Sequence, residues 1–454
     1  MWQVLVPAEL YFCSECGYES HKWLGRCSAC GAWNSFVAQP PPARGGSAVV
    51  PRGAEPVPIT EAAASLVERV LTGIEGTDRV LGGGLVPGSL VLLAGEPGVG
   101  KSTLLLQVAA ALAGPETPAV YVSGEESAQQ VALRARRLGV AAPDLLLLPE
   151  TSAEAVLGHL EGLTPSLVVV DSVQTMVAEG VEAVAGSPTQ VRQVAARFQQ
   201  LAKTRGVPVI LVGHVTKEGM IAGPKLLEHL VDVVLSFEGE PGHDVRLLRA
   251  GKNRFGTVAE LALFAMTDNG LEQVRNPSAW LLEDRQVGAP GSVVAVAVEG
   301  TAPLLVEVQA LVSSSALGTP RRVADGFDNA RLALLLAVLE RRTGARFNDS
   351  DVYVNIVGGL TLREPALDLA VAAALLSSAA DRPLAGDVAV FGEIGLLGEV
   401  RAVSRTAERA REAAALGFAR VATAARNGAT PLALPVHPLE RVDDLATLLE
   451  SKRT

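Results

Sequence analysis

A glycine-rich loop between an apolar strand and a helix places the strongest constraint on how this chain folds. The preceding Leu90–Ala94 is predicted to be a strand and the following Leu104–Leu112 a helix, which is the context that a phosphate-binding loop requires. Glycines let backbone amides surround phosphates, and the helix directs its positive N-terminal end at them. We therefore predict a nucleotide site; the alternative is a glycine turn that only packs strand against helix. The motif G-x-x-x-x-G-K-[ST] and the threonine after it are formed by Gly95, Glu96, Pro97, Gly98, Val99, Gly100, Lys101, Ser102 and Thr103.

The polar side chains of the loop have predicted roles in binding ATP or ADP with Mg²⁺. Lys101 is expected to reach the β- and γ-phosphates, Ser102 to ligate Mg²⁺ and Thr103 to contact the α-phosphate. Leu167–Asp171 is an apolar strand that ends in an acid, which is the Walker B pattern. In a parallel sheet Asp171 lies beside the nucleotide and contributes to the Mg²⁺ site. Its alternative role is a helix N-cap.

Two further predicted strands end in residues that suit ATP hydrolysis. One is followed by Glu125 and Glu126. We favour Glu125 as the catalytic base that positions the attacking water, with Glu126 as the alternative. The other strand ends at His214, whose imidazole is placed to sense the γ-phosphate. A lone histidine can equally be structural.

The order of these patterns divides the chain into four parts. Residues 11–36 hold every cysteine, residues 37–64 form a linker rich in Pro, Gly and Ala, and residues 65–275 alternate apolar runs with helical patterns. The near-continuous Val, Leu and Ile runs predict a parallel α/β sheet covered on both faces. Residues 276–454 are predicted to form a separate α+β domain. Its expected helices are Asn329–Arg342, Ala366–Ser378 and Ser404–Leu416.

Composition limits where the protein works and what it binds. Hydrophobic residues make up 48% of the chain and charged residues 19%, which is typical of a folded protein. No apolar run approaches the ~18–20 residues that span a bilayer, and no export leader precedes the first motif. We expect a cytoplasmic protein that binds no membrane. The net charge of −10 means that any contact with DNA must use a local basic surface.

The cysteines form two C-x-x-C pairs separated by ten residues. Each pair can direct two thiolates at one centre, and together the four complete a tetrahedral Zn²⁺ site with no open position. We predict one structural zinc per chain. The alternatives are two disulfides, which a cytoplasmic setting disfavours, or four unbound thiols. The predicted zinc ligands are Cys13, Cys16, Cys27 and Cys30.

Five motifs together resemble a known family. The runs GEPGVGKST, VSGEES, VVVDSVQT and VGHVTKEG are similar to the RecA/DnaB class of motors, and KNRFG at residues 252–256 is the signature of the bacterial RadA (Sms) DNA-repair family. The resemblance covers the chain from about Tyr11, and the first ten residues have no clear counterpart. It implies a RecA-like P-loop core. It also implies that Lys252 and Arg254 act in catalysis on a neighbouring subunit's nucleotide or line the DNA path, whereas taken alone they form an exposed basic turn.

The same resemblance implies DNA-facing loops and an altered C-terminal domain. The loops correspond to Gln174–Gln190 and Val215–Leu227, with Lys217 and Lys225 as DNA-binding phosphate contacts or as ordinary solvated lysines. Residues 325–418 resemble the proteolytic domain of Lon. A Lon-type site needs a serine and a lysine, and alanine occupies both predicted positions, Ala366 and Ala407. We therefore expect a Lon-like fold without peptidase activity, used as a scaffold.

The family implies a function in recombinational DNA repair. The expected protein is a DNA-dependent ATPase that forms a homo-hexamer, translocates on single-stranded DNA and promotes branch migration of branched DNA alongside the RecA recombinase. One alternative is an ATP-dependent protease, which the two alanines disfavour. The other is a regulatory ATPase switch of the circadian-clock type, which the cysteine module and KNRFG disfavour.

Overall fold

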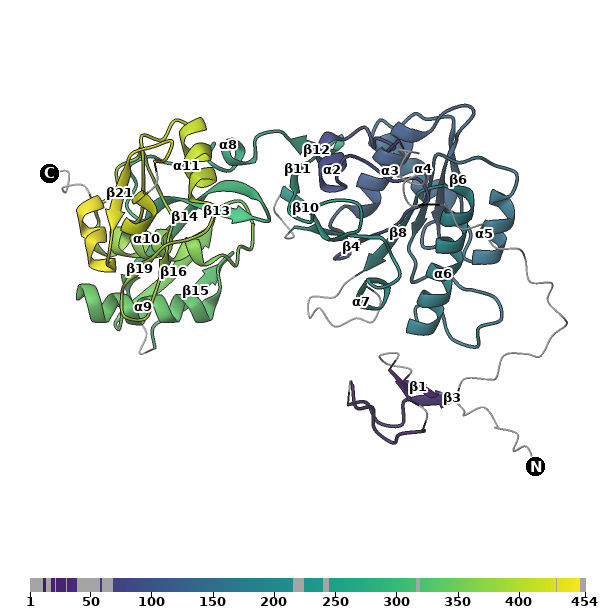
Figure 1. Ribbon diagram of the computed structural model, residues 1–454, viewed down its shortest axis with the longest axis horizontal. Helices are drawn as coiled ribbons and strands as arrows, with labels where there is room; N and C mark the ends of the chain where they lie inside the picture. The colour runs from purple at the N-terminus through teal and green to yellow at the C-terminus, as the bar shows by residue number, and fades with distance from the viewer. Residues whose placement is uncertain are drawn as a thin grey trace. The chain divides into compact units, whose positions relative to one another are not determined.

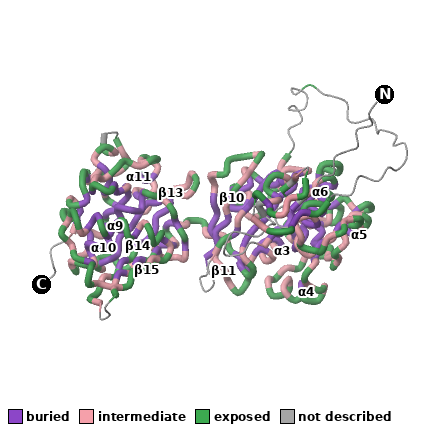
Figure 2. The backbone as a smooth tube through the Cα atoms, turned by 90° about the horizontal axis from the view of Figure 1, so that it is seen from below, coloured by how far each residue is buried: buried purple, intermediate pink, exposed green. Residues whose placement is uncertain are grey.

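The computed structural model describes residues 11–13, 18–20, 22–29, 31–38, 58, 68–214, 224–239, 245–315, 319–429 and 431–449. The chain divides into two compact units whose segments interleave in the sequence (Figure 1). The first comprises Met1–Glu238, Leu248–Val258 and Thr267–Leu271, and the second Gly239–Leu247, Ala259–Met266 and Glu272–Thr454. Residues coloured as buried lie inside each unit, and residues coloured as exposed lie on its outside (Figure 2). Within the described ranges, no helix is both long and apolar enough to cross a membrane.

The N-terminal part of the first unit contains a three-stranded antiparallel sheet in the order β2-β1-β3. Its strands are β1 (Tyr11–Cys13), β2 (Glu19–Ser20) and β3 (Phe36–Ala38). The buried side chains of Cys13, Cys27 and Phe36 form a small core. Because so few apolar groups cannot offset the entropy of ordering the chain, a module of this size needs a cross-link or a metal.

A nine-stranded sheet has the order β12-β11-β10-β9-β4-β8-β7-β5-β6, and its six strands from β9 to β6 lie in the first unit. From β9 to β6 each strand runs parallel to its neighbours. Every residue of β4, β5 and β7 is buried, so the predicted parallel sheet covered on both faces is confirmed. The strands are β4 (Leu90–Gly95), β5 (Ala119–Ser123), β6 (Leu145–Leu148), β7 (Leu167–Asp171), β8 (Val209–His214), β9 (Val233–Glu238), β10 (Val245–Asn253), β11 (Leu261–Thr267) and β12 (Gly270–Val274).

Three helices of this unit begin where a serine side chain satisfies one of their first amides. Ser127, Ser152 and Ser187 each accept a hydrogen bond from the amide three residues later, as good N-cap residues do. The helix after the glycine-rich loop follows Gly100 and has no capping side chain, so its first amides stay available to a ligand. The helices are α2 (Glu75–Val80), α3 (Lys101–Leu112), α4 (Ala128–Arg137), α5 (Ala153–Leu160), α6 (Pro188–Arg205) and α7 (Pro224–Leu227).

The register of the parallel strands brings four strand ends to one edge of the sheet. Gly95 at the end of β4 is level with His214 at the end of β8. Ser123 at the end of β5 is level with Asp171 at the end of β7. Because β7 also pairs with β8, the loops that follow all four strands emerge side by side, where α/β sheets bind ligands.

The second unit has its own seven-stranded sheet, in the order β15-β16-β14-β13-β17-β20-β21. Its strands are β13 (Ser292–Glu299), β14 (Ala302–Ser314), β15 (Arg322–Asp325), β16 (Ser350–Ile356), β17 (Val388–Val390), β20 (Arg420–Ala424) and β21 (Val436–Leu439). A separate hairpin consists of β18 (Glu393–Ile394) and β19 (Val400–Arg401). The helices are α8 (Pro277–Leu281), α9 (Asn329–Thr343), α10 (Asp368–Ala380) and α11 (Thr406–Ala415), with 3₁₀ turns η1 (Pro365–Leu367), η2 (Ala425–Ala429) and η3 (Val442–Leu448).

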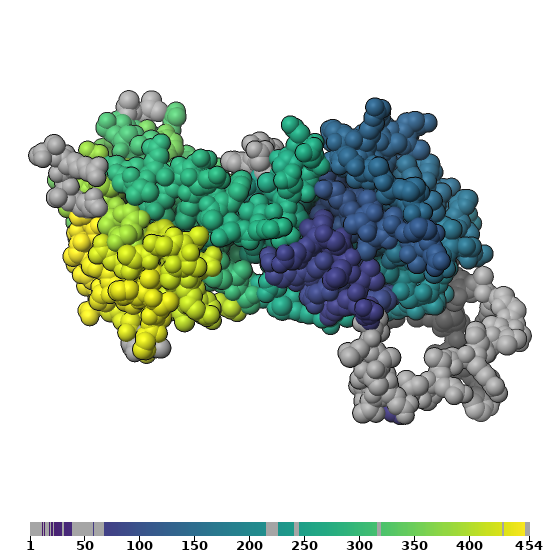
Figure 3. Space-filling view, turned by 90° about the horizontal axis from the view of Figure 1, so that it is seen from above, coloured from purple at the N-terminus to yellow at the C-terminus, as the bar shows by residue number. Residues whose placement is uncertain are grey.

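Helix α10 is the most deeply buried helix segment described in the second unit. Ten consecutive residues from Asp368 to Ser377 are buried, because the helix is covered on all sides, as its uniformly apolar sequence indicates. The three helices predicted for this part of the chain are confirmed as α9, α10 and α11. The segment that contains α11, β20 and β21, yellow in Figure 3, forms a continuous part of the unit's surface.

Candidate active site

The glycines of the phosphate loop are required by its geometry. A Cβ on Gly95 would lie 2.3 Å from the carbonyl oxygen of Phe237, so only glycine lets β4 pass this close to β9. Gly98 and Gly100 adopt φ angles of +78° and +109°, a region that other residues enter only with strain. The tip of the loop at residues 97–98 is exposed. The loop therefore turns its backbone toward solvent, where a phosphate can reach it.

Lys101 is hydrogen-bonded within the phosphate loop through its side chain. Its side chain is 3% exposed, and Nζ donates hydrogen bonds to the carbonyl oxygens of Gly95 and Glu96, both at 2.8 Å. Burial lowers the pKa of Lys101 to about 8, and the Asp171 and Glu125 carboxylates counteract this shift. Because a bound phosphate would add negative charge beside the ammonium group, it would stabilise the charged form.

Asp171 lies at the end of β7 beside a buried tyrosine. Its carboxylate is nearly enclosed, with 9% of the residue exposed, and Oδ2 accepts a hydrogen bond of 2.5 Å from the Tyr121 hydroxyl. Burial and the Asp171 carboxylate raise the pKa of Tyr121 well above its usual range, while a hydrogen bond with Ser102 opposes that shift. A buried hydroxyl is therefore bonded to Asp171, one of the two predicted Mg²⁺ ligands. Sequence reasoning assigned no role to Tyr121, although a tyrosine in a fully buried strand signals a hydroxyl that needs partners.

Glu125 faces the neighbouring strand ends and is half-exposed. Its Oε1 accepts a hydrogen bond of 2.5 Å from Ser172 Oγ and lies 3.2 Å from His214 Nε2. Glu126 instead forms an ion pair with Arg134 of α4. The structure thus brings Glu125 and His214 together and turns Glu126 away from them. Ser172 was not predicted; its signal is its position directly after the Walker B acid.

Gln174 connects His214 to the first of the predicted DNA-facing loops. Its Nε2 lies 3.4 Å from the His214 carbonyl oxygen, and its Oε1 is buried without a hydrogen-bond partner in the part of the chain that is described. Gln190 closes the same loop, accepting from the Ala178 amide and donating to the Val181 and Ala183 carbonyls. The loop after β7 is therefore fastened both to His214 and to helix α6.

The KNRFG turn lies at the opposite edge of the sheet. Arg254 NH1 is 3.2 Å from the Asp232 carboxylate, whose other oxygen accepts from the Leu90 amide at the start of β4. Lys252 Nζ donates to the carbonyls of Glu228 and Val231, at 2.5 and 2.8 Å. Leu90 is separated from Gly95 by the length of β4, roughly 16 Å at ~3.3 Å per residue. The structure therefore does not bring these two cations to the phosphate loop of their own subunit.

The other predicted DNA contacts fall largely beyond what the structure describes. Lys217 and most of the second loop lie outside the described residues, and only the backbone of Lys225, in helix α7, is described. Their roles stay predictions.

The described half of the cysteine module fits a metal site. Cys13 and Cys27 are buried, the Cys13 amide donates a hydrogen bond to the Tyr18 carbonyl, and the Cys27 amide donates one to the Ala32 carbonyl. Gly31 adopts φ +76°, as expected for a knuckle turn after a cysteine pair. Cys16 and Cys30 lie outside the described residues. Four thiols from two such knuckles are a donor set typical of structural Zn²⁺.

The two alanines at the Lon-like positions have different surroundings. Ala366 in η1 is 1% exposed, whereas Ala407 in α11 is exposed. Arg409, two residues beyond Ala407, is fully buried and binds Glu364, two residues before Ala366. The α11 side chain that reaches the Ala366 segment is therefore an arginine held in an ion pair.

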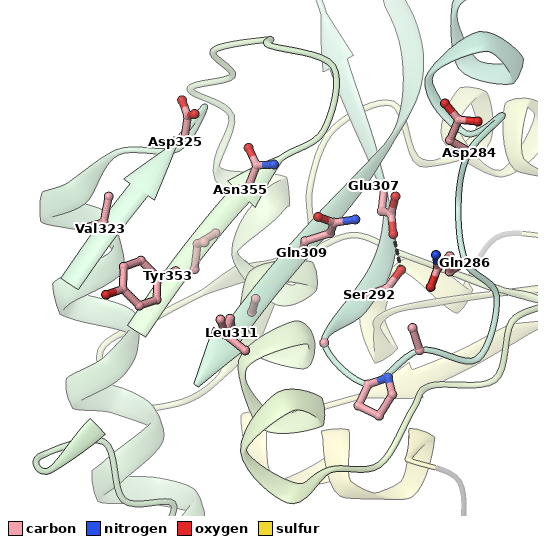
Figure 4. A pocket seen from close by; sticks show the side chains of 15 residues that line it. Asp284, Gln286, Ser292, Glu307, Gln309, Leu311, Val323, Asp325, Tyr353 and Asn355 are labelled. Carbon is pink, nitrogen blue, oxygen red and sulfur yellow. Dashed lines mark hydrogen bonds between the residues drawn. The ribbon is translucent and has the colours of Figure 1, made fainter. Parts of the chain in front are cut away.

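A polar groove of about 510 Å³ also lies on the second unit (Figure 4). Glu307 in its wall is 3% exposed and accepts a hydrogen bond of 2.5 Å from Ser292. Asp284, Asp325 and Asn355 also line it. None of the residues predicted to bind nucleotide, DNA or zinc lies in its wall.

Known protein families match three parts of the chain. A model described as a rubredoxin metal binding domain matches residues 11–38, an AAA domain matches residues 56–220, and subunit ChlI of Mg-chelatase matches residues 329–427. These matches agree with an N-terminal zinc ribbon, an ATPase core and a C-terminal ChlI-like, Lon-like domain.

Curated relatives match nearly the whole chain. The DNA repair protein RadA of Bacillus subtilis is 49% identical over 423 residues, which cover 92% of each chain. The proteins of the same name from Aquifex aeolicus and Pseudomonas aeruginosa are 48% identical, covering 90% of this chain and 91% of theirs.

Two solved structures resemble part of the chain. The RadB recombinase is 25% identical with a TM-score of 0.35, covering 45% of this chain and 99% of that one. A KaiC-like protein of Pyrococcus horikoshii OT3 is 21% identical with a TM-score of 0.39, covering 46% and 99%.

Proposed function

We propose that this chain, which belongs to the RadA family of DNA repair proteins, couples ATP hydrolysis to movement on single-stranded DNA. Membership makes it a DNA-repair ATPase with a RecA-like core and a structural zinc. The finer proposal is a cytoplasmic homo-hexameric ring that promotes branch migration of recombination intermediates alongside RecA. Each chain supplies one ATP site, and the ring supplies the DNA path.

Hydrolysis in this proposal uses the strand-end residues of one subunit. Lys101 leaves its two loop carbonyls and binds the β- and γ-phosphates, while Ser102 and Asp171 hold Mg²⁺. Bound Mg²⁺ neutralises charge that develops between the β- and γ-phosphates. Glu125, held by Ser172 and His214, accepts a proton from the attacking water.

His214 carries the nucleotide state to the DNA-facing loops. Its ring contacts Glu125, and its backbone carbonyl is the acceptor for Gln174 at the head of the loop after β7. The loop after β8 starts at the next residue. A γ-phosphate that displaces the imidazole would therefore move both loops, which is how hydrolysis can change the grip on DNA.

One observation carries the proposal of a multi-subunit motor: the KNRFG cations lie at the sheet edge remote from their own phosphate loop. Within one subunit Lys252 and Arg254 have no phosphate to stabilise. In a ring, the same edge can face the ATP site of a neighbour, where a cation stabilises charge in the transition state. The alternative target of the two cations is the DNA backbone in the channel.

The test compares Lys252→Ala with Arg249→Ala in the full-length protein. Arg249 is a half-exposed cation of the same strand, paired with Glu238 at 2.7 Å, and serves as the matched control. We expect Lys252→Ala to lower ATPase activity in the presence of single-stranded DNA by at least about tenfold, and Arg249→Ala by less than about twofold. Unimpaired ATPase and strand-exchange activity of Lys252→Ala would contradict both proposed roles.

Imaging tests the assembly itself. A sample with an ATP analogue and single-stranded DNA is expected to contain closed six-membered rings with DNA in the channel. Monomers with full DNA-stimulated ATPase activity would contradict the proposed ring assembly.

A further inference from the structure

We infer that Tyr121 is a positioning residue that orients the Asp171 carboxylate, a proposed Mg²⁺ ligand of the ATP site, through a hydrogen bond from its hydroxyl. The inference rests on the proposed role of Asp171 and adds a second residue to it. In the described hydrogen bonds, Tyr121 touches neither the phosphate loop carbonyls nor Glu125. It acts through Asp171.

The first observation is the position of the hydroxyl. Tyr121 lies in β5 and is 1% exposed, with its backbone paired to Val169 of β7. The side chain is therefore enclosed, and its hydroxyl reaches the end of the neighbouring strand, where it donates to Asp171 Oδ2 at 2.5 Å. A buried hydroxyl is costly unless it is bonded. This one is bonded at the metal edge of the sheet.

The second observation is the direction of the hydrogen bond. The Tyr121 hydroxyl gives its proton to Asp171 Oδ2, because an ionised carboxylate only accepts. With Oδ2 committed to Tyr121, Asp171 has Oδ1 left for the metal or its water.

The third observation is the freedom that Asp171 would have without this bond. A carboxylate at a strand end has a broad χ2 distribution. Mg²⁺ demands near-ideal octahedral geometry and tolerates little misplacement of its ligands. A rigid buried phenol that fixes the carboxylate removes this freedom before the nucleotide arrives.

The test measures how strongly Mg²⁺ tightens ADP binding, using fluorescent ADP and the full-length protein. Affinity is determined with excess Mg²⁺ and with EDTA, and their ratio is the Mg²⁺ coupling. Tyr121→Phe keeps the ring and removes only the hydroxyl. We expect the coupling to fall about tenfold, as for a lost hydrogen bond to a charged group, with affinity in EDTA changed by less than about twofold.

Two comparison variants separate this inference from the proposed function. Asp171→Asn should abolish most of the coupling; if the wild-type protein shows none, or if Asp171→Asn keeps it, the proposed Mg²⁺ site itself is wrong. Ser166→Ala removes a hydroxyl bond to the Leu112 carbonyl, 2.8 Å long, just before β7 and away from the nucleotide edge. It should leave the coupling unchanged and so controls for general loosening of the sheet.

One result overturns the inference alone: coupling that is intact in Tyr121→Phe and lost in Asp171→Asn. The thermal unfolding of each variant is recorded in parallel. Tyr121→Met, which fills the same space with a flexible apolar chain, replaces Tyr121→Phe if that variant does not fold. Equal losses of affinity with and without Mg²⁺ would show a merely structural role and would also overturn the inference.

Discussion

The two units enclose charged side chains in different ways. In the first, Lys101 is buried but bonded only to two carbonyls of its own loop, and Glu125 keeps 44% of its side chain exposed. In the second, Arg409 is fully buried, and its guanidinium is bonded to Glu364 and to the carbonyls of Val296 and Ser404. A phosphate can replace the bonds of Lys101. A ligand cannot reach the hydrogen bonds of Arg409. The contrast distinguishes a charged group that can bind a ligand, Lys101, from a charged group that stabilises the fold, Arg409.

The largest effect is expected when Arg409 is removed. Arg409→Ala leaves the Glu364 carboxylate partly buried without its cation and removes a cation over the Phe391 ring. Breaking a buried pair from one side costs about 3–5 kcal/mol. Urea unfolding followed by the fluorescence of Trp280, which packs against the core of the second unit, measures the loss. A change below about 1 kcal/mol would break the comparison.

The matched control for Arg409 is Arg411 of the same helix. Its side chain is 66% exposed and lies 3.8 Å from Glu408, so Arg411→Ala should change the free energy of unfolding by less than about 0.5 kcal/mol. ATPase activity is recorded for both variants. If Arg409→Ala destabilises the second unit and nucleotide affinity is unchanged, the stabilising role of Arg409 is separated from nucleotide binding in the first unit.

The next largest effect is expected on turnover in the first unit. Glu125→Gln removes the group held between Ser172 and His214 and should lower kcat of ATP hydrolysis by about 100- to 1,000-fold, as for loss of a general base. ADP affinity should change little, because the described side-chain hydrogen bonds of Glu125 go to Ser172 and His214 and not to the phosphate loop. Steady-state hydrolysis and fluorescent ADP binding check the two halves of this prediction.

Glu126→Gln is the control for Glu125→Gln. Glu126 is paired with Arg134 and points away from the strand ends, so its replacement should lower kcat by less than about threefold. A larger loss in Glu126→Gln than in Glu125→Gln would reverse the assignment of the base.

Because phosphate oxygens can replace the hydrogen bonds of Lys101, we expect nucleotide binding to depend on pH. In the free protein burial lowers the pKa of Lys101 to about 8, and phosphate oxygens favour its charged form. Above pH 8 binding therefore takes up a proton, and ADP affinity in EDTA should fall by up to about tenfold per pH unit. Calorimetry in two buffers of different ionisation enthalpy detects that proton. Affinity that is constant from pH 7.5 to 9.5 would contradict it.

Sequence reasoning reached the parts of the site that short-range patterns encode. Leu167–Asp171 is the strand that its apolar run predicts, and the ends of parallel strands must share an edge, so the neighbourhood of Asp171 and the phosphate loop followed from motif order. The cysteine spacing and the helices of the second unit are local signals of the same kind.

The remaining features depend on pairings between distant segments. Tyr121 and Asp171 are 50 residues apart, and Glu364 and Arg409 are 45 apart. Apolar periodicity fixes which face a residue occupies but not which partner meets it there. The partners of Lys252 could not be predicted for a different reason: they are backbone carbonyls, which carry no sequence signal.

The smallest effect is expected from restoring a serine and a lysine at the two alanines of the second unit. Ala366→Ser with Ala407→Lys should hydrolyse casein no faster than the unaltered protein, because Ala366 is 1% exposed while Ala407 lies on the surface. A Ser–Lys site needs the hydroxyl and the amine within hydrogen-bond reach and open to substrate. Glu364 and Arg409 already occupy the space beside Ala366. Peptide hydrolysis by the double variant, and not by Ala407→Lys alone, would contradict this prediction. It would show that the second unit retains the geometry of a Ser–Lys protease site, and that its charged side chains, like those of the first unit, can take part in catalysis.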